Sequence, residues 1–111
     1  MGALNPKLKK YLTAFGSGTT ALMLERVRHE RARQRMLLDK RRITTDCSSP
    51  KVKNSLKLPI LVEEVGEVSK EINEWIENFA EDTCRRRMQA ELIQVAAVAV
   101  AWAESLEEEG R

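Results

Sequence analysis

Residues 58–80 read LPILVEEVGEVSKEINEWIENFA, and this stretch decides the fold class. Its apolar residues recur every three or four positions, which is the period of one face of an α-helix. They are Leu58, Leu61, Val62, Val65, Val68, Ile72, Trp75, Ile76 and Phe79. Proline suits the first turn of a helix, so this helix is predicted to begin between Ser55 and Pro59 and to end near Ala80. Glu64, Glu67 and Glu71 border the stripe, whereas Glu63 points further away.

Further helices are predicted on both sides of this one. No Gly or Pro interrupts residues 21–41. Leu24, Val27 and Leu38 form an apolar stripe there, which is incomplete because Arg31 lies on the same face. Either Thr19 or Thr20 is the expected N-cap of that helix. Before it, an N-terminal extension (residues 1–20) contains apolar residues at helical spacing, which predicts a short helix through Tyr11 and Phe15. Residues 44–54, with their Ser and Thr residues and Pro50, predict a loop.

The last predicted helix begins after a short connection at residues 81–83, with Asp82 or Thr83 as its cap. Its segment from Val95 to Ala103 is apolar on every side, and a helix of that kind is usually buried on every side. Two other helices of one chain cannot surround it. The sequence therefore predicts an all-α fold of three main helices, which forms four-helix-bundle-like cores when the chain assembles as a homodimer or tetramer.

Two pairs of oxygen-bearing side chains stand out on the predicted helices. Glu64 and Glu67 are three residues apart on one predicted helix, and Glu91 and Gln94 have the same spacing on the next. Residues three apart share a helix face, so antiparallel neighbours can bring the four side chains together. Carboxylate oxygens are the ligands that Mg²⁺ prefers. The competing interpretation is a solvated acidic surface, since 32% of the residues are charged.

The segment from Leu58 to Leu106 resembles the MazG-like all-α nucleoside triphosphate pyrophosphohydrolases, particularly small members from phages and mobile elements. Their signature is an ExxE pair on one helix and an ExxD pair on the next, here matched by Glu64, Glu67 and Glu91. The run Glu30-Arg31-Ala32-Arg33-Gln34 resembles the ERxxQ stretch of their first helix. The resemblance covers roughly residues 22–108, within the helical domain expected at residues 21–111. Gln94 stands where the family usually has Asp, and residues 35–38 (RMLL) replace the acidic and aromatic residues often found there.

The resemblance implies hydrolysis of the α–β phosphoanhydride of a nucleoside triphosphate, which gives a monophosphate and pyrophosphate. Implied metal ligands for Mg²⁺, or for Mn²⁺ in its place, are Glu64, Glu67, Glu91 and, more weakly, Gln94. Glu63 or Glu71 is the expected base that orients water. Substrate contacts are expected from Arg31, Gln34 and Lys70.

Charge is distributed unevenly along a chain whose 111 residues support one domain. Residues 1–57 contain 14 Lys/Arg and 4 Asp/Glu, a net charge of +10, whereas residues 58–111 contain 5 and 13, a net charge of −8. A basic half leaves open a helical nucleic-acid-binding or interaction protein. Aromatic residues make up only 5% of the chain and do not interleave with the arginines, which argues against a base-stacking surface. A nucleotide-binding paralogue with weakened catalysis is the other alternative, because Gln94 removes one charge.

The remaining features point to an ordinary intracellular protein. The N-terminus MGALNPKLKK lacks the apolar core of a signal peptide, and no apolar run approaches the ~20 residues that span a bilayer. We therefore expect a cytoplasmic location and no membrane partner. Cys47 and Cys84 have no metal-binding or redox spacing and are expected to be reduced thiols. His29 is expected on the surface of an arginine-rich helix.

Overall fold

The computed structural model describes residues 5–40, 46–78 and 81–110, and the described residues contain helices and no β-strand. The helices are α1 (Lys9–Phe15), α2 (Thr19–Asp39), α3 (Asn54–Asn78) and α4 (Glu81–Glu109), with a 3-10 turn at Pro6–Leu8 before α1. The predictions of an all-α chain, of three main helices and of a short N-terminal helix are confirmed. Assembly into a bundle stays a prediction.

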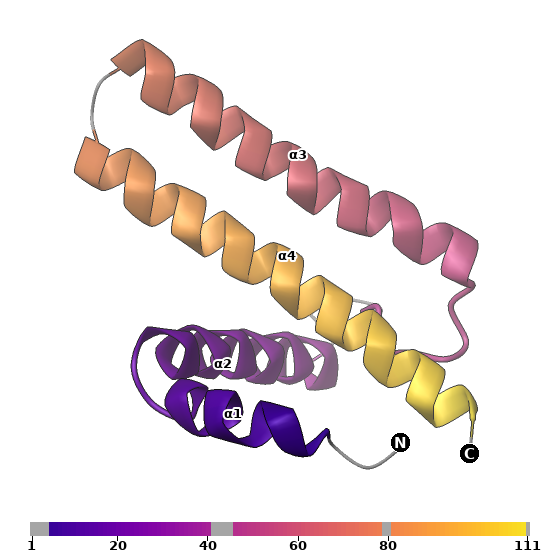
Figure 1. Cartoon of the computed structure of the whole chain (residues 1–111). Helices are drawn as coiled ribbons and strands as arrows, with labels where there is room; N and C mark the ends of the chain where they lie inside the picture. Colours follow the sequence, from indigo (N-terminus) through magenta and orange to yellow (C-terminus); the bar gives the residue numbers. More distant parts are fainter. Residues whose placement is uncertain (1–4, 41–45, 79–80, 111) are drawn as a thin grey trace.

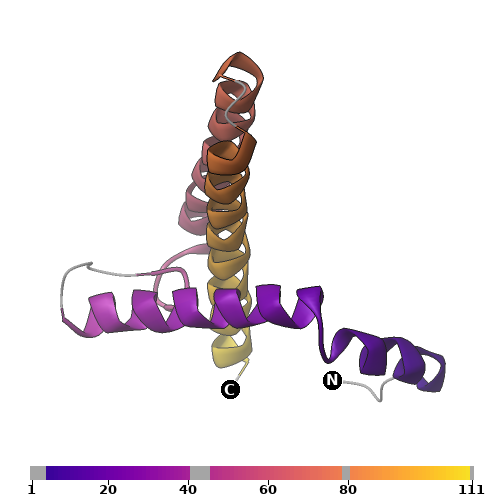
Figure 2. The same cartoon turned by 90° about the vertical axis from the view of Figure 1, so that its left-hand side faces the viewer.

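The three main helices form a pair and a crossing. Helices α3 and α4 lie side by side along most of their length and run antiparallel (Figure 1). Helix α2 crosses α4 instead of running along it, and α1 extends beyond the N-terminal end of α2 (Figure 2). Side chains from all three main helices can therefore meet only near the place where α2 crosses α4.

The predicted starts of the three main helices were wrong. Helix α3 begins at Asn54, just before the predicted range, and Pro59 lies inside the helix and not in its first turn. The N-cap of α2 is Gly18, and no side chain caps this end. The backbone φ of Gly18 is 84°, in a region that favours glycine, so the chain turns there and Thr19 and Thr20 are already helical. Helix α4 begins at Glu81, and Asp82 and Thr83 lie in its first turn. The helix dipole stabilises acidic side chains in a first turn, so Glu81 and Asp82 are favourable inside the N-terminal end of α4.

A small core lies where α4 meets α3 and the loop before it. Cys47, Val98 and Ala101 are buried there, with the partly buried Leu61 and Trp102 packed against them. The indole nitrogen of Trp102 donates a hydrogen bond to the Asn54 side chain at 2.9 Å, which ties α4 to the first residue of α3. Trp102 therefore serves packing. Both cysteines are free thiols and buried.

A buried polar contact joins the same two helices. The ammonium of Lys57 on α3 is fully buried and donates a hydrogen bond to the Ser105 hydroxyl of α4 at 2.6 Å. That hydroxyl donates in turn to the backbone oxygen of Trp102, also at 2.6 Å. No ion pair among the described residues includes Lys57. Removal of a neutral acceptor here would leave the buried ammonium poorly solvated.

The single chain leaves much apolar surface uncovered. On α3 the exposed members of the predicted stripe include Val62 at 59% and Ile76 at 68%, because only α4 among the described helices packs against α3. On α4, Ala97, Val98 and Ala101 are buried but Ala99 and Val100 are exposed. On α2, Val27 is buried, whereas Leu24, predicted to face the core, is exposed. Phe79 lies outside the described residues. Association with a second copy would cover such a surface.

Candidate metal and phosphate site

Helix α3 supplies the first acidic group of the site. Glu64 is half-buried, whereas its neighbours Glu63 and Glu67 are exposed. This difference follows from the helical period, because Glu64 lies nearer to the stripe that faces α4. Of these three carboxylates, Glu64 is therefore the one held closest to the interface with α4.

Glu64 lies at the centre of a group of carboxylates from three helices. Burial raises the pKa of the Glu64 carboxyl, and the negative charge of Glu91 on α4 raises it further. Glu63, Glu67 and Glu30 of α2 act in the same direction. Like charges favour the protonated form only over short distances. Glu91 of α4 and Glu30 of the crossing helix α2 thus lie near enough to Glu64 for their charges to act on it. Convergence of all four predicted side chains on one cation stays a prediction.

Glu30 is the site residue that the sequence-based assignment missed. Its carboxylate accepts hydrogen bonds from Arg33 at 2.6, 2.9 and 3.1 Å, a forked contact along α2. The amide of Gln94 on α4 also lies near Glu30 and acts on its carboxylate. Burial alone would raise the pKa of Glu30, but the contacts with Arg33, Gln94 and Gln34 outweigh burial and lower it. The sequence does contain a signal for Glu30, because Glu30 is the first residue of the ERxxQ stretch. Only Arg31 and Gln34 of that stretch were predicted to belong to the site.

The carboxylates do not form a closed metal cage as they stand. Within residues 5–40, 46–78 and 81–110, no three His, Cys, Asp or Glu side chains are grouped closely enough to hold a metal ion. Their donor atoms are nevertheless those that a hard divalent cation requires. Repulsion between unneutralised carboxylates opposes a closer approach, and a cation would remove that opposition.

The second base candidate, Glu71, faces a cation instead of the other carboxylates. The Arg87 guanidinium lies 3.1 Å from Oε2 of Glu71 and 3.1 Å from Oε2 of Glu74. The buried Oε2 of Glu71 has no hydrogen bond among the described residues, so the contact with Arg87 is one of charge and not of aligned donor and acceptor. Lys70, a predicted substrate contact, is exposed on α3. Glu71 is thus the less available of the two candidate bases.

Arg31 is a structural link rather than an open cation. It donates to Gln34 at 2.6 Å, to Asp46 at 3.2 Å and to Glu104 at 2.9 Å. The side chains of Arg31 and Asp46 are only 10% and 8% exposed. Gln34 in turn donates to Glu30 at 3.4 Å. Arg31 and Gln34 therefore connect the described part of the loop, α4 and Glu30, and sequence alone did not predict this role.

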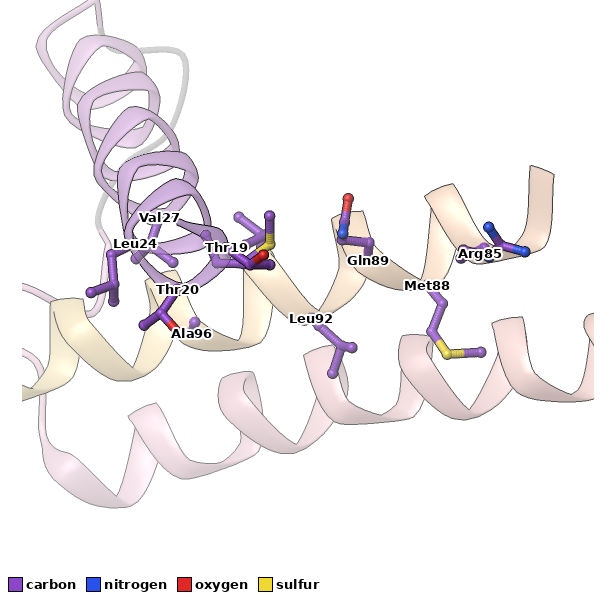
Figure 3. A pocket seen from close by; sticks show the side chains of 11 residues that line it. Thr19, Thr20, Leu24, Val27, Arg85, Met88, Gln89, Leu92 and Ala96 are labelled. Atoms are coloured by element: carbon purple, nitrogen blue, oxygen red, sulfur yellow. The ribbon is translucent and has the colours of Figure 1, made fainter. Parts of the chain in front are cut away.

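A separate groove carries little polar character. It has a volume of about 540 Å³ and lies between the N-terminal half of α2 and one face of α4 (Figure 3). Leu24 and Val27 of α2 and Met88 and Leu92 of α4 contribute to its walls. Among the described residues that line it, Arg85 alone is charged. Such a lining suits apolar contacts and not a metal or a phosphate.

The chain matches no protein-family model, no curated protein and no solved structure. None of the described helices is both long and apolar enough to cross a lipid bilayer.

Proposed function

We propose that this protein is a nucleoside triphosphate pyrophosphohydrolase that depends on a divalent cation and releases a nucleoside monophosphate and pyrophosphate. One observation carries the proposal: burial raises the pKa of Glu64, and the negative charges of carboxylates from α2, α3 and α4 raise it further. A folded protein gains no stability from such repulsion, so acidic groups gathered in this way usually serve a site. The motif resemblance gives the reaction class.

Mg²⁺ or Mn²⁺ is the cofactor that the donor atoms fit. Glu64, Glu67 and Glu91 are the proposed ligands, and Glu30 joins them from α2. Gln94 lies beside Glu30 and lowers its pKa, so its proposed role is to hold that carboxylate in place and not to bind the cation strongly. A bound divalent cation would neutralise phosphate charge and lower the pKa of water.

The protein's own groups supply the remaining chemistry. No ion pair among the described residues involves Glu63, and its carboxylate is exposed beside Glu64, so Glu63 is the proposed base that orients and deprotonates water. Arg31 and Gln34 act as positioning residues through the hydrogen bond to Glu30. Lys70 remains a proposed contact for substrate phosphate from the exposed side of α3.

One alternative is a paralogue that binds nucleotides but hydrolyses them poorly. Gln94 provides no negative charge, so a cation would be held more weakly than by a family member with Asp. Nucleic-acid binding receives less support, because Arg28, Arg31 and Arg33 of α2 are all paired with carboxylates. Paired arginines contribute less to binding of a phosphate backbone.

A hydrolysis screen tests the proposal. The common NTPs and dNTPs are incubated with the protein and Mg²⁺ or Mn²⁺, and pyrophosphate and the monophosphate are quantified. Glu64→Gln and Glu91→Gln should each lower the rate by about a hundredfold or more, because charge stabilisation at a metal site amounts to several kcal/mol. Glu107→Gln, at an exposed position of α4, is the matched control and should retain full activity. Nucleotide binding without pyrophosphate release would favour the weakened paralogue.

A further inference from the structure

A second groove, lined by cations, adjoins the carboxylates. It has a volume of about 370 Å³ and lies between α2 and α4. Its polar lining includes Arg26, His29 and Arg33 of α2 and Arg86, Gln89 and Gln94 of α4, and Glu30 lies at the same groove. A volume of this size falls within the range of roughly 300–1,000 Å³ that is usual for ligand pockets.

Helical spacing explains why these side chains share one groove. On α2 the lining residues are at positions 26, 29, 30 and 33, and on α4 they are at 86, 89, 90, 93 and 94. Each set follows the three- and four-residue steps that place side chains on one face of a helix. The arginines are therefore aligned by both helices and are not scattered over the surface.

Two of the arginines have charge available for a ligand. Arg26 donates its hydrogen bond to Gln89, a neutral amide. Neither Arg26 nor Arg86 takes part in an ion pair among the described residues. Arg33 is bound to Glu30, and His29 lies 3.1 Å from Glu25. The groove thus has a positive balance directly beside the acidic group.

We propose that this groove binds the diphosphate portion of the substrate, which leaves as pyrophosphate, with Arg26 and Arg86 as the principal contacts. The proposal rests on the proposed function, because it assigns the phosphate chain to one side of the carboxylates. Arg26 and Arg33 are two helical turns apart, about 10 Å along α2, so one phosphate group cannot contact the whole length of the groove. One guanidinium group can donate two parallel hydrogen bonds to two phosphate oxygens, so several arginines along a groove suit a chain of phosphates.

A second consequence concerns Arg33. A divalent cation at Glu30 would weaken the forked contact between Arg33 and that carboxylate. Arg33 would then be available to a phosphate in the same groove. Cation binding and phosphate binding would thus be coupled through Glu30.

Calorimetric titration with inorganic pyrophosphate, at low ionic strength and in EDTA, tests the groove without any turnover. Arg26→Gln and Arg86→Gln should each weaken pyrophosphate binding by about tenfold, as expected for loss of one charge-assisted hydrogen bond. Arg28→Gln removes the same charge from α2 outside the groove, where Arg28 is exposed and paired with Glu25, and should change the affinity by less than about twofold. Orthophosphate should bind more weakly than pyrophosphate.

The outcomes separate the groove from the proposed function. Unchanged pyrophosphate affinity in Arg26→Gln and Arg86→Gln, or an equal loss in Arg28→Gln, overturns the groove even if the protein hydrolyses nucleotides. The expected losses support the groove even if no nucleotide is hydrolysed. Tighter binding of a single-stranded oligonucleotide, with the same arginine dependence, would assign the groove to nucleic acid instead. Circular dichroism checks that each variant is folded. If Arg26→Gln is unfolded because it has lost its bond to Gln89, the result for Arg86→Gln is the one that tests the groove.

Discussion

Gln94 of α4 and Glu30 of α2 line the same groove, where their helices cross. The polar amide of Gln94 helps to lower the pKa of the Glu30 carboxyl. This contact gives a physical reason for an amide at a position where an acidic residue was expected. Aspartate at position 94 would face Glu30 with a like charge.

The first prediction follows from that contact. Gln94→Asp removes a donor and adds a negative charge, so without divalent cations it should lower the thermal unfolding midpoint by several degrees, equivalent to about 1–3 kcal/mol. Added Mg²⁺ should recover most of the loss, because the new carboxylate then has a cation to bind. Differential scanning fluorimetry in EDTA and in Mg²⁺ measures both effects. Gln94→Ala, which loses the amide without adding charge, serves as control; equal Mg²⁺ stabilisation of Gln94→Asp and the unmodified protein would refute the placement.

The second prediction concerns the pH dependence of stability at Glu64. Its pKa is raised above the ordinary value of 4.5, so the folded protein binds this proton more tightly than the unfolded chain. The stability contribution is present below pH 4.5 and is lost as the pH rises through the folded-state pKa. Glu64→Gln should therefore unfold a few degrees higher than the unmodified protein at pH 7.5 and at nearly the same temperature below pH 4.5. It should also be inactive.

Thermal unfolding across this pH range measures the Glu64 effect, with exposed Glu67→Gln as the matched substitution, for which a smaller gain is expected. A Glu64→Gln protein that is less stable than the unmodified protein at pH 7.5 would contradict the assigned repulsion.

The third prediction tests the buried contact between Lys57 and Ser105. Ser105→Ala leaves the fully buried ammonium without its hydroxyl acceptor and should lower the free energy of unfolding by about 1–3 kcal/mol. Lys57→Met removes the charge together with its need for an acceptor and should be less damaging. Urea unfolding of the three proteins gives the comparison, and a Ser105→Ala protein as stable as the unmodified one would show that this bond contributes nothing.

The fourth prediction concerns assembly. Ala99 is an exposed residue of the apolar segment of α4. Burial of each exposed Val in an interface would contribute roughly 1.5 kcal/mol to association. We expect a homodimer or tetramer at micromolar concentration, which Ala99→Glu should dissociate by placing an unpaired charge in the interface. Ala32→Glu, at an exposed position of α2, is the control. Light scattering that shows a well-folded monomer of the unmodified protein would exclude this arrangement.

The sequence predicted those features that depend on helical period. The stripe from Leu58 to Ile76 correctly indicated α3, and its period explains why Glu64 is half-buried. Features that depend on the way α2 crosses α4 were not predictable, because no local pattern encodes a crossing. Glu30 belongs to the ERxxQ stretch, but only the crossing brings it near Glu64.

Arg31 shows the same limit. A cationic side chain on the first long helix was expected to contact substrate, but the fold places it between Asp46 and Glu104, from distant parts of the chain. Helix starts were also mistaken where backbone conformation, at Gly18, took the place of a side-chain cap.

The central claim is that Glu30, Glu64 and Glu91, from three different helices, bind one divalent cation. Electron paramagnetic resonance of Mn²⁺ measures this directly, because free and bound Mn²⁺ give different spectra. The account predicts saturable Mn²⁺ binding to the unmodified protein and to Glu107→Gln, with affinity reduced by about tenfold or more in each of Glu30→Gln, Glu64→Gln and Glu91→Gln. Equal Mn²⁺ affinity in all five proteins, or loss in Glu107→Gln as large as in the other three, would contradict it.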